Sequence, residues 1–177
     1  MESNEKNQAP AGQSAGKFMM FATWIGLFVM LTLYFGNWEG KQINPNQSPD
    51  SFQQGQIRTV ILQSNKLHHY MANGSINSFP VTFLLDTGAS DVVVPAKLAQ
   101  KLGLPKGQGN YATTANGEVQ VFSSRINYLK LGNIVLRDIE AAINPGMKGE
   151  EVLLGMSALK YLEFSQKGDK LELRQRL

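Results

Sequence analysis

The longest hydrophobic stretch of the chain lies near its N-terminus. No charged side chain occurs between Lys17 and Glu39, and the dense part of this stretch reads FMMFATWIGLFVMLTLYF. A helix needs about 20 apolar residues to cross the ~30 Å hydrocarbon core of a bilayer. Tyr34 and Trp38 lie near the far end of the stretch, where aromatic side chains favour the membrane interface. The pattern therefore predicts a transmembrane anchor over residues 18–38.

A cleaved signal peptide is the alternative interpretation of this segment. Signal peptides usually have an apolar core of about 7–15 residues, followed by a cleavage site between small side chains. The core here is longer, and Tyr34–Trp38 offers no such site, so we favour an uncleaved anchor. Lys6 and Lys17 precede the segment and only Lys41 closely follows it. By the positive-inside rule the N-terminus is expected in the cytoplasm and the rest of the chain on the other side.

The regions on either side of the anchor are polar and carry few large apolar side chains. Residues 1–17 cannot bury a core, so we expect a disordered cytoplasmic tail. Residues 39–56 have a similar composition and are expected to form a flexible tether. The folded domain is then expected to span residues 57–177.

Short apolar runs separated by turn residues fill this domain. Asn73-Gly74 and Ala115-Asn116-Gly117 each suggest a hairpin, and Gly103 ends a helical segment. Such a pattern predicts a small β domain, closed or sandwich-like, with two short helices. The expected strands are 58–62, 67–71, 81–85, 91–94, 111–114, 118–122, 125–131, 134–136, 139–143 and 171–173, and the expected helices are 97–102 and 157–162.

Composition narrows the chemistry that this domain can perform. The chain carries a net charge of +3 from scattered basic residues, which gives no support for nucleic-acid binding. It has no cysteine, so thiol nucleophiles, disulfides and Cys-ligated metals are excluded. Its two histidines, His68 and His69, are adjacent, and on a strand they would point to opposite faces. No metal site is expected.

One segment concentrates the candidate chemistry: Leu84-Leu85-Asp86-Thr87-Gly88-Ala89-Ser90. An apolar strand leads directly to Asp86, which should place the carboxylate in a partly buried site. Thr87 supplies a hydroxyl, and Gly88 permits close backbone approach. An ordinary Asx turn that ends a hairpin is the alternative interpretation of Asp-Thr-Gly alone.

Together with two later segments, this loop resembles the retropepsin-like aspartic proteases, specifically their small membrane-anchored bacterial group. Thr113–Val119 contains a glycine-bearing hairpin where the family has its flap. Val152–Ser157 matches the family's element of two apolar residues and a glycine before a short helix. Viral members continue this element with Arg-Asn or Arg-Asp, whereas this chain has Met156-Ser157, as bacterial members do. The resemblance implies an all-β, single-domain, retropepsin-like closed barrel with one or two short helices, preceded by one transmembrane helix.

The resemblance also implies an aspartic endopeptidase with Asp86, Thr87 and Gly88 as its catalytic loop. Such hydrolysis needs two carboxylates that share a proton around one water molecule. The chain holds a single Asp-Thr/Ser-Gly sequence, so a symmetric homodimer must supply the second carboxylate. Thr87 would then brace the opposing loop, and no cofactor is expected.

The remaining expectations concern the substrate and the location of the protein. Ala89 and the flap residues Ala115, Asn116 and Gly117 are expected to bind an extended polypeptide as a strand. The resemblance and the apolar segment imply a single-pass protein of the bacterial inner membrane, with its protease domain outside the cytoplasm. A non-catalytic dimeric peptide-binding module with the same fold is the alternative function.

Overall fold

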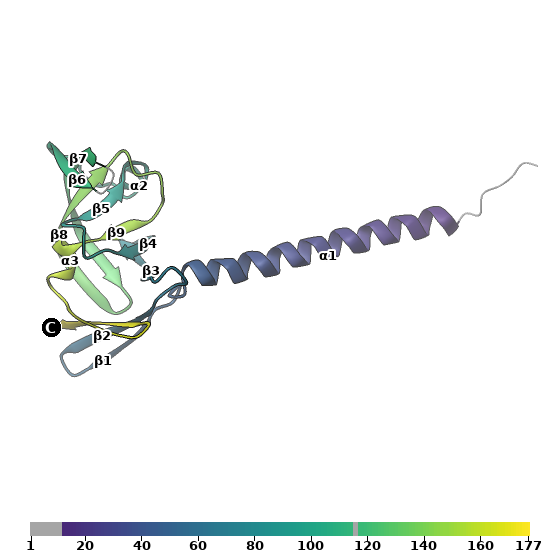
Figure 1. Cartoon of the computed structure of the whole chain (residues 1–177), viewed down its shortest axis with the longest axis horizontal. Coiled ribbons are helices and arrows are strands. Elements are labelled where there is room, and N and C mark those ends of the chain that lie inside the picture. The colour runs from purple at the N-terminus through teal and green to yellow at the C-terminus, as the bar shows by residue number, and fades with distance from the viewer. Residues whose placement is uncertain (1–11, 115–116) are drawn as a thin grey trace, which may run out of the picture. The chain divides into compact units, whose positions relative to one another are not determined.

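The computed structural model describes residues 12–114 and 117–177 of the 177-residue chain. The chain divides into two compact units, Met1–Gly40 and Lys41–Leu177, and each is treated by itself. Helix α1 (Gly12–Ile43) begins in the first unit and ends in the second, and every strand belongs to the second unit (Figure 1).

Helix α1 contains the predicted anchor and is longer than predicted at both ends. Its described apolar side chains are exposed, as Trp24 is at 62%. Its segment Gly16–Ile43 is long and apolar enough to cross a membrane. The residues of the predicted disordered tail that the structure describes, 12–17, are helical, and residues 1–11 lie outside the described part. At its other end the helix continues to Ile43 because Pro45 disfavours helical backbone only at the residue before it, Asn44.

The larger of two sheets in the second unit confirms the expected closed β fold. Its strand order is β3-β4-β9-β5-β8-β7-β6, and β3 also pairs with β7. This extra pairing joins β3, β4, β9, β5, β8 and β7 into a closed ring, and β6 extends beyond it. The strands are β3 (Met71–Ile76), β4 (Phe79–Leu85), β5 (Val92–Pro95), β6 (Gly109–Thr114), β7 (Gly117–Leu131), β8 (Ile134–Asn144) and β9 (Val152–Leu154).

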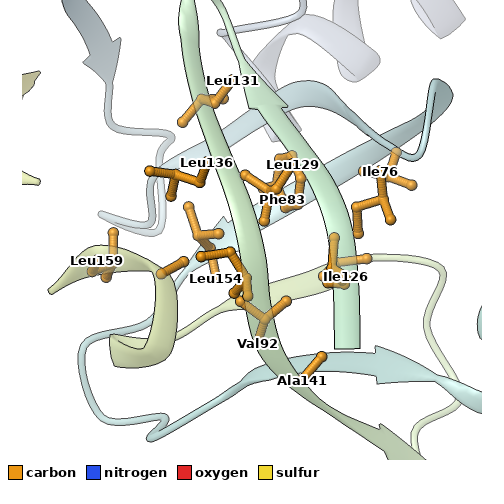
Figure 2. Packing of buried hydrophobic residues seen from close by; sticks show 14 of the residues in the cluster. Ile76, Phe83, Val92, Ile126, Leu129, Leu131, Leu136, Ala141, Leu154 and Leu159 are labelled. Carbon is orange, nitrogen blue, oxygen red and sulfur yellow. The ribbon is translucent and has the colours of Figure 1, made fainter. Parts of the chain in front are cut away.

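The interior of this ring is filled by alternate side chains of its strands, as period-two patterning predicts. Phe83 of β4, Ile126 of β7 and Leu154 of β9 are almost completely buried and point toward one another across the core (Figure 2). Two short helices pack against the barrel: α2 (Ala96–Lys101) and α3 (Met156–Leu159). Both coincide with predicted helical segments.

The second sheet corrects the expected tether. Its order is β1-β2-β11-β10, formed by β1 (Asp50–Gln54), β2 (Ile57–Gln63), β10 (Glu163–Lys167) and β11 (Lys170–Arg176). Strand β1 and the buried side chains of Asn44 and Asn46 lie within residues 39–56, which were expected to be flexible. Polarity misled the prediction, because these asparagines satisfy backbone groups of the domain and do not face solvent.

The first predicted hairpin also turns at a different place. Asn73-Gly74 lies inside β3, and the turn is formed by Asn77-Ser78, both of which have positive φ. Gly74 is needed inside the strand because any Cβ there would collide with the Lys130 carbonyl oxygen. The two histidines precede β3 in a loop that is not part of a strand.

Candidate active site

Asp86 directly follows β4, at the point where this strand lies parallel to β9. Leu85 is the register partner of Leu154, and the Asp86 N–H donates to the Leu154 carbonyl at 3.2 Å. On the other side of β4, the Leu85 N–H donates to the Tyr70 carbonyl at 3.0 Å. Two neighbouring segments therefore fix the backbone just before the carboxylate, whose residue is half-buried.

The loop after Asp86 is a tight turn around the carboxylate. The Gly88 N–H donates to Asp86 Oδ1 at 2.9 Å, and the Ala89 N–H donates to the Asp86 carbonyl at 3.2 Å. The first bond is that of an Asx turn and the second closes a backbone β-turn, so the ordinary interpretation of Asp-Thr-Gly describes the local geometry correctly. Thr87 and Gly88 are exposed, which leaves the Thr87 hydroxyl and the tip of the loop open to another molecule.

Helix α3 holds this loop in place through backbone hydrogen bonds. The Met156 N–H donates to the Ala89 carbonyl and the Ser157 N–H to the Ser90 carbonyl, both at 2.8 Å. The approach requires glycine at position 155, because a Cβ there would lie 2.6 Å from the Ala89 carbonyl oxygen. The glycine of the third matched segment thus has a direct physical reason.

Ser157 is a supporting residue that the sequence analysis did not single out. Its buried Oγ accepts the Val92 N–H at 2.9 Å and donates to the Glu140 carbonyl at 2.7 Å. It thereby joins α3 to the strands β5 and β8. The only sequence signal was its position two residues after Gly155, which does not reveal a buried hydroxyl.

The second matched segment forms an arm of two strands, β6 and β7. This arm lies at the end of the domain opposite to β1 and β2 (Figure 1). Thr114 Oγ1 donates to the Gly117 carbonyl at 2.8 Å, and Gly117 has a φ of +104°. Ala115 and Asn116, which were expected to bind substrate, lie outside the described residues.

Two other titratable groups of the domain, Arg125 and Tyr70, have shifted pKa values. Arg125 holds Asp138 at 2.7 Å and Glu140 at 3.7 Å, beside a surface cavity of about 470 Å³ that also reaches Asp91. The hydrogen bond with Asp138 raises the pKa of Arg125. Burial, and secondarily the Asp169 carboxylate, raises the pKa of the Tyr70 phenol, so Tyr70 is no base at neutral pH.

A single chain therefore places one half-buried carboxylate, Asp86, in a well-braced turn whose tip is exposed. Within residues 12–114 and 117–177, no cluster of three His, Cys, Asp or Glu side chains could hold a metal ion. The arrangement can supply one half of an acid–base pair.

A family model described as "gag-polyprotein putative aspartyl protease" matches residues 72–161. The chain belongs to this family. The match begins in β3 and ends just after α3, so it includes the Asp86 loop, the arm and the α3 support.

Two curated relatives are similar to this chain over part of their length. An uncharacterized protein encoded in the cobV 5′ region of Sinorhizobium sp is 33% identical over 119 residues, covering 65% of this chain and 51% of the relative. An uncharacterized protein of Rickettsia prowazekii is 30% identical over 108 residues, covering 59% of this chain and 46% of the relative. The chain thus spans about half the length of the curated relatives it matches.

The structure is also similar to the crystal structure of a retropepsin-like aspartic protease from Rickettsia conorii. The TM-score is 0.56 at 25% sequence identity, over 72% of this chain and 94% of that chain. Together with the strand ring, this similarity confirms the expected retropepsin-like fold.

Proposed function

We propose that the protein is a membrane-anchored aspartic endopeptidase that is active as a homodimer. The observation that carries the proposal is the loop Asp86-Thr87-Gly88, in which Asp86 is half-buried and the other two residues are exposed. It is braced on β9 and α3, in a chain that offers one such loop. An acid–base pair needs a second, equivalent carboxylate. A two-fold axis beside the exposed loop tip would supply it from a second copy.

The reaction follows from two such carboxylates with a water molecule between them. One carboxylate removes a proton from the water, which attacks the scissile carbonyl carbon. The protonated partner donates its proton to the carbonyl oxygen, which gives a tetrahedral diol. When the diol collapses, the first carboxyl gives the proton that it took from water to the leaving nitrogen, and the second carboxylate takes a proton back from one hydroxyl. The C–N bond breaks, and both carboxyl groups return to their starting states. In this scheme the Gly88 N–H holds Asp86 Oδ1 in position, Thr87 contacts the opposing loop, and Ala89 lies beside the peptide.

The proposed substrate is an extended polypeptide that lies between the Asp86 loop and the arm. An extended peptide binds as a strand, so its backbone supplies affinity and its alternate side chains supply specificity. The arm, including Ala115, Asn116 and Gly117, would close over the peptide and exclude water. The chemistry needs no metal or cofactor.

We assign α1 to the bacterial inner membrane as an uncleaved, single-pass anchor. Its apolar side chains are exposed on all sides, as in a helix that is surrounded by lipid. Lys6 and Lys17 support a cytoplasmic N-terminus, which puts the protease domain outside the cytoplasm.

The proposal is tested by replacing Asp86 with Asn in the full chain. The amide cannot act as a base, so cleavage of an unbiased peptide mixture between about pH 4 and 7 should fall by about 100-fold or more. Asp50→Asn makes the same chemical change at an exposed position of β1 and should leave cleavage unchanged.

Equal cleavage by the wild type and Asp86→Asn would refute the catalytic role. Absence of cleavage by a wild-type sample that is demonstrably dimeric would instead favour the peptide-binding module. Flotation of the chain with liposomes after carbonate washing tests the anchor separately.

A further inference from the structure

The four-stranded sheet of the protease domain has two strand edges, one at β1 and one at β10. The last strand, β11, is internal to this sheet, because β2 pairs with it on one side and β10 on the other. Among the described strands β10 pairs with β11 alone, and all five of its residues, Glu163–Lys167, are exposed. An unpaired strand edge is a template for another strand. The edge of β10 is therefore open to a partner.

Hydrogen bonding within the sheet shows which backbone groups of β10 face this open edge. Directly after β2, the Ser64 N–H donates to the Asp169 carbonyl at 2.8 Å. Because antiparallel bonding alternates along a strand, the odd-numbered residues of β11 bond to β2 and its even-numbered residues bond to β10. The register partners of these even-numbered residues are the odd-numbered residues of β10. The N–H and C=O groups of Phe164 and Gln166 are therefore turned to the open edge.

The charges of β10 are complementary to those of a second, antiparallel copy of the same strand. When Ser165 faces Ser165 of the second copy, Glu163 of each copy faces Lys167 of the other. Within its own chain Lys167 has a like charge, Lys170, as its register partner. Neither lysine forms an ion pair within the described part of the chain. Opposite charges across two strands stabilise their pairing, so a carboxylate from the second copy would offset this repulsion.

The same register also uses the free backbone groups and the aromatic ring of β10. Phe164 faces Gln166 of the second copy, and such a pair exchanges two N–H···O=C hydrogen bonds. The two-fold symmetry repeats the pair on the other side of the axis. The ring of Phe164 is 48% exposed, on the face of the sheet that carries its buried register partner Leu173. Diagonal neighbours on paired strands are within reach of aromatic side chains, so the two Phe164 rings would pack across the axis.

A short and well-braced connection joins β10 to the candidate active-site loop. Only residues 160–162 separate α3 from β10, and the N–H of the buried Leu162 donates to the Leu159 carbonyl at 2.9 Å. At the other end of α3, the Met156 N–H donates to the Ala89 carbonyl at 2.8 Å. Pairing of two β10 strands would therefore fix the two active-site loops relative to each other. The four-stranded sheet lies at the end of the domain opposite to the arm, which stays free to close (Figure 1).

We propose that the protein dimerises through β10, with two copies paired antiparallel about an axis at Ser165. The pairing joins the two four-stranded sheets into one. The other edge strand, β1, has Asp50 as its only charged residue and offers no such complementarity. A substrate strand is the alternative occupant, but the opposition of Glu163 and Lys167 is specific to a second copy. The inference rests on the proposed homodimer and deepens it, because it names the surface that brings the second Asp86 to the first.

The cysteine-free chain allows the register to be tested with one introduced thiol. In the proposed pair the two Ser165 Cα atoms lie about 4.5 Å apart, within the range that a disulfide spans. Ser165→Cys in the full-length protein should therefore form a disulfide-linked dimer under mild oxidation. Gln166→Cys is the matched control. Its two Cα atoms would lie about 8 Å apart, so it should cross-link at least about 10-fold more slowly.

Charge reversal tests the opposition of Glu163 and Lys167. Glu163→Lys alone and Lys167→Glu alone each place like charges opposite each other at both ends of β10. Each should weaken dimerisation of the full-length protein by about 10- to 30-fold, as measured by analytical ultracentrifugation in detergent. A mixture of the two variants restores opposite charges at both ends, so heterodimers should form and cleave peptide. Asp50→Lys and Lys130→Glu reverse exposed charges elsewhere on the domain and should leave dimerisation unchanged.

Any of three results would overturn the proposal. They are equal cross-linking of the two thiol variants in a dimeric sample, dimerisation of both single charge variants as in the wild type, or no recovery in their mixture. The thiol variants change no charge, so misfolding of a charge variant would not protect the proposal.

Peptide cleavage in the same samples separates this inference from the proposed function. Asp86-dependent cleavage by a dimer that fails these tests removes the β10 interface and leaves the protease. A dimer that passes them and does not cleave keeps the interface and removes the protease. A wild-type chain that forms no dimer removes both.

Discussion

Ser157 shows how a single buried hydroxyl positions the candidate active-site loop. Its Oγ lies between the Val92 N–H and the Glu140 carbonyl, on two strands that are not its own. Its N–H also binds the Ser90 carbonyl within the loop. Removal of the hydroxyl leaves a buried donor and a buried acceptor without their partner, which costs more than the bonds themselves contribute.

We therefore expect Ser157→Ala to lower the free energy of unfolding by about 1–3 kcal/mol. Cleavage per folded molecule should fall as well, because the Asp86 loop loses part of its support. Ser124→Ala is the matched control, since the Ser124 hydroxyl donates one exposed hydrogen bond to the Pro105 carbonyl at 2.7 Å. Urea unfolding of both variants measures the difference, and equal stabilities would contradict the assigned role.

At this scale the sequence pointed to the candidate loop Asp86-Thr87-Gly88 but not to the residue that supports it. The sequence Asp86-Thr87-Gly88 can be recognised because its residues are consecutive and each has a distinct chemical property. The supporting role of Ser157 cannot be recognised in this way, because its hydrogen-bond partners lie 65 and 17 residues away in the sequence. Only the three-dimensional structure brings such partners together.

Among the elements, the segment that was expected to be a tether has an unexpected structural role. Asn46 is buried, and its side-chain amide donates to the carbonyls of Gln63 and Met71 and accepts the Gln63 N–H. One side chain thus satisfies backbone groups of two segments that meet at the junction of the sheets. Strand β1 pairs along β2 over five register positions, Asp50 to Gln54.

This role predicts where the soluble domain must begin. The fragment 57–177, suggested by sequence alone, lacks β1 and Asn46, and should be less stable than the fragment 41–177. Within 41–177, Asn46→Ala should cost about 2–4 kcal/mol because one buried and two part-buried backbone groups lose their partner. Asn110→Ala changes an exposed asparagine and should cost little. Thermal unfolding gives the stability of the two fragments and of the two variants of 41–177. Equal stability of the two fragments would contradict the prediction.

Element prediction succeeded where hydrophobic periodicity was strong and failed where polar side chains form the structure. Strands such as β4 and β5 carry apolar side chains that enter the core, and both were expected. Strand β1, with the sequence Asp-Ser-Phe-Gln-Gln, has every side chain exposed, so its sequence has no apolar face to detect. Asn73-Gly74 is a common turn sequence, but here both residues lie inside β3, where the Phe83 ring packs against Gly74.

On the scale of the whole molecule, each chain brings one Asp-Thr-Gly loop, so the proposed active unit must contain two chains. Mixing variants tests this directly. If wild-type and Asp86→Asn chains pair at random in equal amounts, about one quarter of the dimers carry two aspartates. Cleavage per wild-type chain should then fall to about one half of its value in the unmixed protein.

The mixing experiment requires that the chains exchange, which co-expression and joint reconstitution ensure. Asp50→Asn chains, which keep Asp86, replace the Asp86→Asn chains in a parallel mixture, and there cleavage per chain that carries Asp86 should stay unchanged. If cleavage per wild-type chain does not change when Asp86→Asn chains are added, a single chain must be active by itself.

The global fold was largely predictable, because the family's three segments occur in order within one domain. A closed barrel was expected, but the strand pair that closes it, β3 with β7, was not predicted, and neither was the four-stranded sheet. Both depend on pairings between distant strands.

The proposed anchoring of each chain by α1 also has a consequence for how a pair of these proteins would face its substrate. Two copies anchored in the same bilayer with the same sidedness can be related only by a rotation axis along the membrane normal. A scissile bond placed between the two Asp86 residues would lie on that axis, and an extended peptide crosses the axis at a steep angle. The peptide would therefore run parallel to the membrane plane. Such an enzyme is suited to chains lying along the bilayer surface, and a polypeptide that emerges perpendicular to the bilayer would have to bend before it could be cut.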